Sequence, residues 1–286
     1  MSEDTKSRQA LLRTFVTCNH ILHKNGILDA YGHISVRNPE NPNTFFMSRN
    51  MPPALVSSAD DVVEYQIEDA EPIAKNAPRG FIERYIHSEI MKRFSGVNVV
   101  VHAHTPDILP FTIAPVPLRP AIHMAGFLGT HVPVWDIADA YCSGDKPDLL
   151  VRNASLGQAF AAAYPATDAS GAQSRESVAR DVPTQPLVLM RGHGFTACAE
   201  SLETALFYAI YTLNAARVQT SALALRSAQL LQGNDQTASE TKAEAVVFLS
   251  EAEAQHTWAM NKGTMARPWA LWSREVEVDP LYRNDV

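Results

Sequence analysis

The chain has 286 residues, a length that fits one large domain or two small ones, and we expect a single domain over residues 1–286. Hydrophobic residues make up 46% and charged residues 19%, as in ordinary globular proteins, and no apolar run approaches the roughly 20 residues of a membrane helix. The formal net charge of −7, without clustered Lys or Arg, argues against a nucleic-acid-binding protein. The three cysteines are far apart and argue against a disulfide framework, and the N-terminal stretch has no apolar signal core. We therefore expect a cytoplasmic protein with neither a membrane nor a nucleic-acid partner.

Hydrophobic periodicity in the first half of the chain predicts two helices and four strands. Residues 7–25 have helical spacing that ends at Asn25-Gly26, as a helix C-terminus should. An Asn/Pro-rich turn between two strand-like segments predicts a hairpin. The expected elements are strands at 33–37, 44–48, 61–67 and 97–103 and a helix at 83–94.

The second half predicts two more strands, at 132–137 and 187–190, and helices at 153–164, with Asn153 or Ser155 as cap, and 201–231. Residues 165–185 have no apolar period and predict an exposed loop, and a C-terminal extension from about residue 232 includes a helical stretch at 244–263. The aromatic segment 268–282 either packs on its own core or lies across a neighbouring subunit. Together, these elements predict an α/β fold with a central mixed or mostly antiparallel sheet flanked by helices.

A valine-rich strand ends in His102-Ala103-His104. Because side chains alternate along a strand, the two histidines project from one face about 7 Å apart, a span that one metal ion can bridge. The alternative is that both are polar residues emerging into solvent at a strand end. Burying two imidazoles without a partner costs desolvation energy, so we favour the metal site.

A catalytic metal usually has three protein ligands, and the sequence offers candidates for the remaining positions. His193 stands between two glycines after the 187–190 strand, although the same pattern fits a tight turn with an incidental histidine. Glu83 begins a helix that leads into the strand with the two histidines, and this order can bring Glu83 near the end of that strand. Glu83 is therefore a candidate fourth ligand or acid/base group. An acidic residue in a first helical turn is also common simply because it offsets the helix dipole. His87, one turn later, is expected in the core or behind the ligands.

With these residues in place, the sequence resembles the class II aldolase/adducin family. The matching positions are Glu83, the His102-Ala103-His104 motif nineteen residues later, the RGHG motif with His193, and the helix SLETALFYAIYTLNAAR, and the resemblance spans about residues 8–230. It implies a three-layer α/β/α fold around a mostly antiparallel sheet, and commonly a tetramer with active sites at subunit interfaces. It also implies that His102, His104 and His193 bind a divalent metal, usually zinc, and that Glu83 acts as acid/base. Manganese, iron and cobalt are accepted by the same ligands.

The sequence departs from the sugar-phosphate members of the family where they bind phosphate. The GNxS turn carries His33 in place of Asn, the Ser-Gly loop has gained Arg49, and the Ser-Ser pair is replaced by Gly80, Phe81 and Ile82. Arg49 offers a planar fork suited to a carboxylate. We therefore expect Arg49 and Phe81 to contact a small carboxylated substrate; the alternative for His33 and Arg49 is that they are polar surface residues of a hairpin.

These features resemble the decarboxylase branch of the family, which acts on hydroxylated aromatic or pyridine dicarboxylates. We predict a metal-dependent carbon–carbon lyase, in the first place a non-oxidative decarboxylase, with Glu83 or His33 protonating the carbon. His123 is a further candidate for the pocket, or else a core histidine. The alternatives are a retro-aldolase acting on a non-phosphorylated hydroxy-keto acid and a non-catalytic, adducin-like interaction module. All four candidate ligands are present, which argues against the last.

Overall fold

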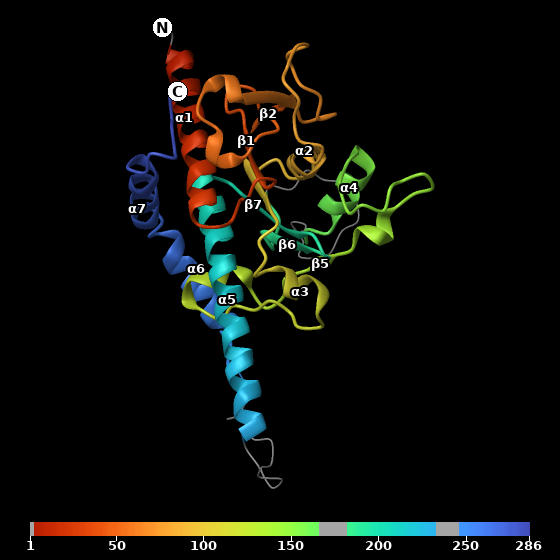
Figure 1. Cartoon of the computed structure of the whole chain (residues 1–286), viewed down its shortest axis with the longest axis vertical. Helices are drawn as coiled ribbons and strands as arrows, with labels where there is room; N and C mark the ends of the chain where they lie inside the picture. The colour runs from red at the N-terminus through yellow and green to blue at the C-terminus, as the bar shows by residue number, and fades with distance from the viewer. Residues whose placement is uncertain (1–2, 166–181, 233–245) are drawn as a thin grey trace.

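A computed structural model describes residues 3–165, 182–232 and 246–286, and it places seven strands in one sheet (Figure 1). The strand order is β3-β2-β1-β4-β7-β6-β5. All neighbouring strands are antiparallel except the pair β5 and β6 at one edge. The strands are β1 His33–Arg37, β2 Thr44–Ser48, β3 Val62–Gln66, β4 Val99–Ala103, β5 Val134–Trp135, β6 Leu187–Met190 and β7 Gly194–Ala199. The mostly antiparallel sheet predicted from the sequence is confirmed.

Helices cover both faces of this sheet and complete three layers. On one face, α1 (Glu3–Lys24) and α5 (Leu202–Gln232) bury an apolar cluster that includes alternate residues of β4. On the other face lie α2 (Arg84–Arg93) and α4 (Ala154–Ala162). These two helices approach closely at Gly157, where a Cβ atom would lie 2.6 Å from the carbonyl oxygen of Tyr85. The α/β/α arrangement is therefore as expected.

The alternation along β4 determines which layer receives the histidine pair. Val99, Val101 and Ala103 belong to the core under α1 and α5, whereas Val100 belongs to the core under α2 and α4. His102 shares the face of Val100, because side chains two residues apart point the same way. The β4 histidine thus faces α2, the helix that Glu83 precedes.

The C-terminal helices pack on the outside of the first helical layer (Figure 1). Helix α6 (Glu251–Lys262) starts at a Ser250 capping box and lies against the 3₁₀ segment His123–Leu128, called η3. Helix α7 (Ala266–Glu277) lies on α1, and Tyr282 beyond it is buried, with its hydroxyl 2.9 Å from Nδ1 of His23. In this chain the aromatic segment 268–282 packs on its own fold.

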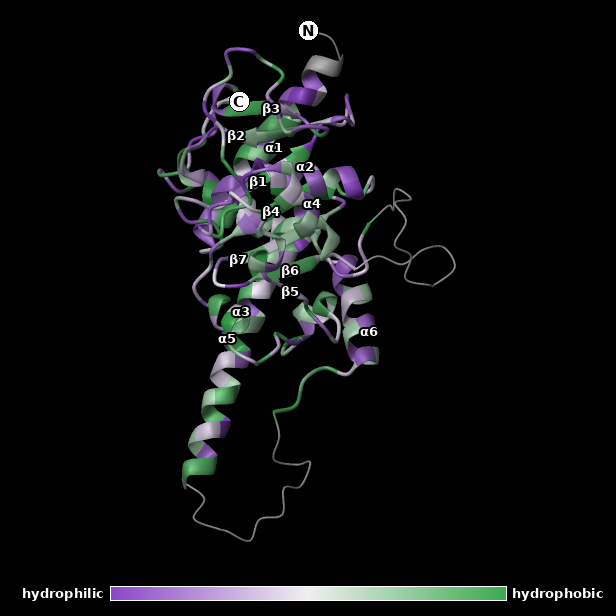
Figure 2. Cartoon of the chain, turned by 90° about the vertical axis from the view of Figure 1, so that its right-hand side faces the viewer, coloured by the Kyte–Doolittle hydropathy of each residue, from purple (hydrophilic) through white to green (hydrophobic). Residues whose placement is uncertain are grey.

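Several element predictions were incomplete. Strand β7, the short helix α3 (Leu109–Ile113) and α7 were not predicted, and the last predicted helix begins only at Glu251. Residues 166–181 of the predicted loop lie outside the described part of the chain. Figure 2 shows α5 extending well beyond the sheet, with apolar and polar residues interspersed. Among the described residues, no helix has the length and apolar character needed to cross a membrane.

Candidate metal centre and active site

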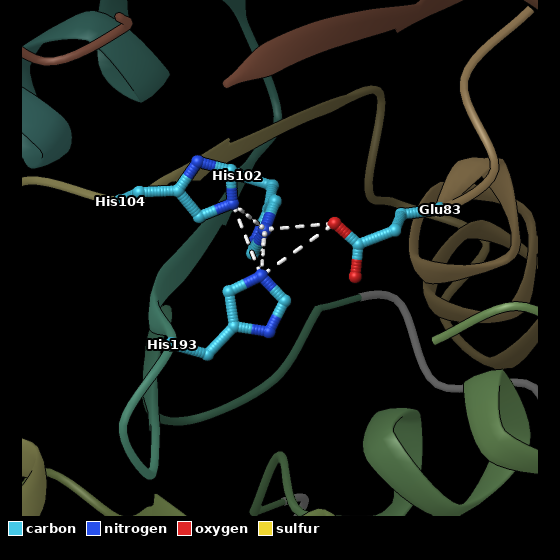
Figure 3. Close-up of side chains that lie close together, drawn as sticks. All are labelled: Glu83, His102, His104 and His193. Atoms are coloured by element: carbon cyan, nitrogen blue, oxygen red, sulfur yellow. Dashed lines mark hydrogen bonds and ion pairs between the residues drawn. The ribbon is translucent and has the colours of Figure 1, made fainter. Parts of the chain in front are cut away.

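Four side chains from distant parts of the sequence converge beside the neighbouring strands β4 and β7 (Figure 3). His102 lies at the end of β4 and His104 just beyond it, while His193 occupies the turn between β6 and β7. Glu83 is the residue at which the chain enters α2. The structure therefore brings together all three predicted metal ligands and the predicted acid/base residue.

The spacing of these four groups fits a single metal ion. The Nε2 atom of His104 lies 3.0 Å from that of His102 and 3.0 Å from that of His193, and the latter two are 3.3 Å apart. A tetrahedral ion with nitrogen ligands at about 2.0–2.1 Å requires about 3.3 Å between neighbouring ligand atoms. An Oε2 atom of Glu83 completes the group at 3.5 Å from Nε2 of His102 and of His193. Three imidazoles and a carboxylate form a donor set that suits a divalent transition metal.

The outward-facing nitrogen of each imidazole has a partner of its own. Nδ1 of His193 donates to the carbonyl oxygen of Leu149 at 2.9 Å, so the lone pair of Nε2 faces the other ligands. Nδ1 of His102 lies 3.0 Å from the Thr196 hydroxyl, and Nδ1 of His104 lies 3.7 Å from Asp29. Such partners hold rings in orientation, so the ligand geometry exists before a metal arrives.

The glycines around His193 explain how the histidine reaches the site. Gly192 has φ +63°, a left-handed conformation that favours glycine, and its N–H donates to the Thr112 hydroxyl at 3.0 Å. At Gly194, a Cβ atom would lie 2.0 Å from the carbonyl oxygen of Ala103 on the neighbouring strand. The segment is therefore a tight turn, and that turn is what presents His193 to the β4 histidines.

The electrostatics of the cluster favour the unprotonated forms that metal binding requires at Glu83, His102 and His104, but not at His193. Burial opposes the charge on Glu83, but hydrogen bonding and charge interaction with His102 and His193 outweigh it and hold the Glu83 pKa well below its usual range. Burial, followed by the neighbouring His102 and His193, lowers the pKa of His104 to about 4. Burial also lowers the pKa of His102, whereas for His193 the interactions with Glu83 outweigh burial and raise the pKa. Glu83 is thus ionised at neutral pH, and its Oε1 accepts the Val151 N–H at 3.1 Å.

A cavity of about 380 Å³ opens next to the ligands. Its lining includes Glu83 and His104, and the ring of Phe81 lies 4.6 Å from the ring of His33, between centroids, at its wall. The remaining lining residues are Asp29, Tyr31, Asn50, Arg79, Ile82 and Leu150. The cavity therefore combines two candidate metal ligands, an apolar wall and one arginine.

The structure places the other predicted site residues as follows. His33 and Phe81 line the cavity. Arg49 is paired with Asp61, with 2.9 Å between its Nε and Oδ1, and is not among the residues that line the cavity. His123 is exposed at the start of η3, where its carbonyl oxygen accepts from Asn261, and it does not line the cavity either. The substrate-binding roles of Arg49, Phe81 and His123 remain predictions.

Sequence reasoning missed several contributors. Arg79, Asn50 and Leu150 reach the cavity from loops, and loop paths carry no periodic signal. Thr196 would have been found had β7 been predicted, because it lies directly opposite His102 in the β4–β7 register. The Leu149 carbonyl leaves no signature in the sequence, since any residue type supplies it.

A second hollow, of about 730 Å³, lies between η3, α5 and α6. Phe127, Tyr208 and Trp258 form its apolar wall. Lys262 and Glu200 also line it and form an ion pair, with 3.5 Å between Nζ and Oε2. None of the four clustered ligands lines it. The candidate metal site therefore borders the smaller cavity.

Comparison with known proteins agrees with this fold and site. The chain belongs to the class II aldolase and adducin N-terminal domain family, whose model matches residues 13–220. It is 45% identical over 273 residues to the decarboxylase tropJ of Talaromyces stipitatus, with 96% of each chain covered. It is 26% identical over 200 residues to a 3,4-dihydroxyphthalate decarboxylase of Arthrobacter keyseri, with 68% of this chain and 71% of the relative covered.

Two solved structures show the same fold at low identity. An L-fuculose 1-phosphate aldolase from Glaciozyma antarctica superimposes with a TM-score of 0.66 at 17% identity, covering 99% of this chain and 96% of the other. An aldolase II superfamily protein from Pseudomonas syringae gives 0.67 at 18% identity, with 100% and 98% covered. The family assignment made from the His and Glu motifs is confirmed.

Proposed function

We propose that this protein is a lyase, and specifically a divalent-metal-dependent, non-oxidative decarboxylase of hydroxylated aromatic carboxylic acids. The observation that carries the proposal is the cavity, where Glu83 and His104 of the four-residue cluster lie beside Phe81, Ile82 and Arg79, whose side chain has no charged partner among the described residues. The names of the two curated relatives, both decarboxylases, support the reaction type. The presence of all four candidate ligands argues against a non-catalytic interaction module.

The reaction requires a group that moves one proton and a means of stabilising charge. A divalent metal held by His102, His104 and His193 would supply a Lewis acid that stabilises negative charge on a substrate oxygen. Glu83 is ionised and faces the same point, so it takes the proton of the substrate hydroxyl. When the bond to the carboxylate breaks and carbon dioxide leaves, the electron pair remains on the ring carbon. Glu83 returns its proton to that carbon, and its own charge is restored.

Recognition of the substrate divides between two walls of the cavity. Phe81 and Ile82 offer apolar surface to a flat ring, in the region where sugar-phosphate members carry the Ser-Ser pair. The Arg79 side chain makes no hydrogen bond or ion pair with any residue that the structure describes, which leaves its guanidinium free to pair with a substrate carboxylate. We therefore assign to Arg79 the carboxylate contact that the sequence suggested for Arg49.

The proposal also covers the identity of the metal ion and the oligomeric state of the protein. Zinc is the first candidate, and manganese, iron and cobalt are the alternatives, because all four accept three imidazoles and a carboxylate. A homotetramer in the cytoplasm is the expected form. Metal analysis of the purified protein and light scattering in solution would test the metal and the assembly.

The direct test incubates purified protein, loaded with each metal in turn, with hydroxylated benzoic and phthalic acids and with hydroxy-keto acids. Release of carbon dioxide without an aldehyde is the expected result. Formation of an aldehyde or pyruvate from the hydroxy-keto acids would instead make the protein an aldolase. A protein that binds no divalent ion and converts neither class would have to be reassigned as an interaction module.

A further inference from the structure

A buried chain of three side chains leads from the protein interior to the cavity. The Ser35 hydroxyl lies 2.6 Å from Nδ1 of His87, and Nε2 of His87 lies 2.8 Å from Nδ1 of His33. All three residues are at most 1% exposed. His33 also lines the cavity, and its ring lies 4.6 Å from that of Phe81 and 5.1 Å from that of His102, between centroids.

The surroundings of both imidazoles in this chain favour the neutral form. Neither forms a hydrogen bond to a carboxylate among the described residues, and burial disfavours a charged ring. A neutral imidazole carries one N–H, so a single hydrogen is shared between the two facing nitrogens. The nitrogen that carries this hydrogen determines which atom is the donor in each of the other hydrogen bonds between Ser35, His87 and His33.

The hydrogen bonds can run in either of two directions along these three side chains, and in only one direction does every hydrogen have an acceptor. If His87 donated to Ser35, the Ser35 hydroxyl hydrogen would need another acceptor, and within the described residues this hydroxyl has no partner but His87. A buried hydroxyl without an acceptor carries a desolvation penalty. In the other arrangement Ser35 donates to Nδ1 of His87, and Nε2–H of His87 donates to Nδ1 of His33. The remaining hydrogen of His33 then lies on Nε2, the ring nitrogen of this cavity-lining residue that does not face His87.

We propose that Ser35 and His87 are positioning residues that hold His33 as the Nε2–H tautomer, so that the cavity offers substrate a neutral N–H donor. This inference deepens the proposed function and rests on it only for the identity of the group that receives the hydrogen bond. A neutral imidazole that gave up this proton would become an imidazolate, and Ser35 cannot resupply it without forming an alkoxide. His33 therefore donates a hydrogen bond to a developing negative oxygen or a carboxylate, and the mobile proton belongs to Glu83.

The tautomer can be measured without substrate. In zinc-loaded protein with ¹⁵N-labelled histidine, couplings between ring protons and ring nitrogens distinguish Nε2–H from Nδ1–H. The His33 signal is identified by its loss in His33→Gln and, independently, in His33→Asn. An Nε2–H pattern supports the inference, and an Nδ1–H or doubly protonated ring overturns it. Because no turnover is involved, the wrong tautomer would leave the proposed decarboxylase standing, and a correct tautomer without turnover would sink only the proposed decarboxylase.

Steady-state kinetics provide the second test, with a substrate that the protein is found to decarboxylate. His33→Gln keeps a neutral N–H near the position of Nε2 and should retain activity within about tenfold, whereas His33→Ala should lose about 10- to 100-fold in kcat/KM. His87→Gln can still accept from Ser35 and donate to His33, so it should outperform His87→Leu. A purely structural role for His87 predicts the opposite order, because leucine fills the space without a buried polar group. Equal losses for His33→Gln and His33→Ala, or better activity in His87→Leu, would contradict the inference.

Discussion

His33 and His102 lie directly opposite each other on the antiparallel strands β1 and β4. Their rings point to the same side of the sheet, with 5.1 Å between centroids. The residue that we propose to contact substrate, His33, therefore lies on the strand next to the one that carries His102, a proposed metal ligand. The pairing of β1 with β4 fixes the separation of the two residues, so the proposed substrate-contacting and metal-binding residues are held by the same pair of strands.

Loss of a ligand should remove the metal without unfolding the chain. We expect His102→Ala or His193→Ala to weaken metal binding more than about 100-fold, beyond the 10- to 100-fold typical of an outer partner, and to abolish turnover. Metal content after dialysis, with circular dichroism as the check on folding, measures this. His256→Gln, on the exposed face of α6, is the matched control and should bind metal normally. Retained turnover in either alanine variant would refute the site.

The Thr196 hydroxyl should affect the metal without touching it. Thr196→Val keeps the shape of the side chain but removes the partner of Nδ1 of His102, so we expect metal affinity to fall about 10- to 100-fold. Competition with a chromophoric chelator measures the affinity. Thr257→Val on α6 removes a hydroxyl that bonds only to its own helix and should leave affinity unchanged. If the two variants bind metal equally well, the Thr196 contact has no such role.

Arg79 and Arg49 should have separable effects. Arg79→Ala should raise KM for a carboxylated substrate, with a loss of about 10- to 100-fold in kcat/KM, because a charged hydrogen bond to substrate disappears. Arg49→Ala should change kcat/KM little and lower stability by at most about 1 kcal/mol, since its ion pair with Asp61 is partly exposed. Steady-state kinetics and thermal unfolding of both variants measure this. The reverse assignment, with the larger kinetic loss at Arg49, would return the carboxylate contact to Arg49.

The Asp61 carboxylate should make stability depend on pH. Burial alone would raise its pKa, but the N–H groups of Ser57 and Ser58 and the Arg49 guanidinium outweigh burial and lower the pKa below its usual value. A lowered folded-state pKa means that the stabilisation is present above the unfolded value of about 3.9 and disappears as pH falls through the folded value. Asp61→Asn should therefore cost about 1–3 kcal/mol at pH 7 and progressively less below about pH 4. Denaturant titrations at several pH values would show whether the difference narrows; a constant difference would contradict the assignment.

Metal removal should lower thermal stability. The ligands come from segments as far apart as Glu83 and His193, so an unfolded chain offers no comparable site. At a free metal concentration of about 1,000 times Kd, binding to the folded state contributes about 4 kcal/mol, enough for a shift of several degrees in Tm. Calorimetry before and after chelation measures the shift. His193→Ala should show no shift on chelation, and a shift of the same size in that variant would place the metal elsewhere.

The sequence predicted the parts of this molecule that depend on repeating patterns and on residue chemistry. Apolar runs gave β1, β2 and β6 with the bounds that the structure shows, and the His-Ala-His alternation gave two ligands on one face. Strand β7 was missed because most of its residues are small ones, Gly, Ala and Cys, that do not favour a strand by themselves, and it is a strand through its pairing with β4 and β6. Which arginine reaches the cavity depends on the path of the loops and on a tertiary ion pair, and neither has a sequence period.

The close approach at Gly194 has a consequence for how the protein tolerates change. With the Ala103 carbonyl only 2.0 Å from where a Cβ would stand, any other residue would push β7 away from β4. A slip of one residue between paired strands turns each side chain to the opposite face. Such a slip would move Thr196 away from His102 and carry the turn with His193 out of reach. Retention of the proposed metal would therefore depend on a position with no side chain, and we expect a Gly194→Ala variant to lose activity through misaligned backbone while all its candidate ligands remain in the sequence.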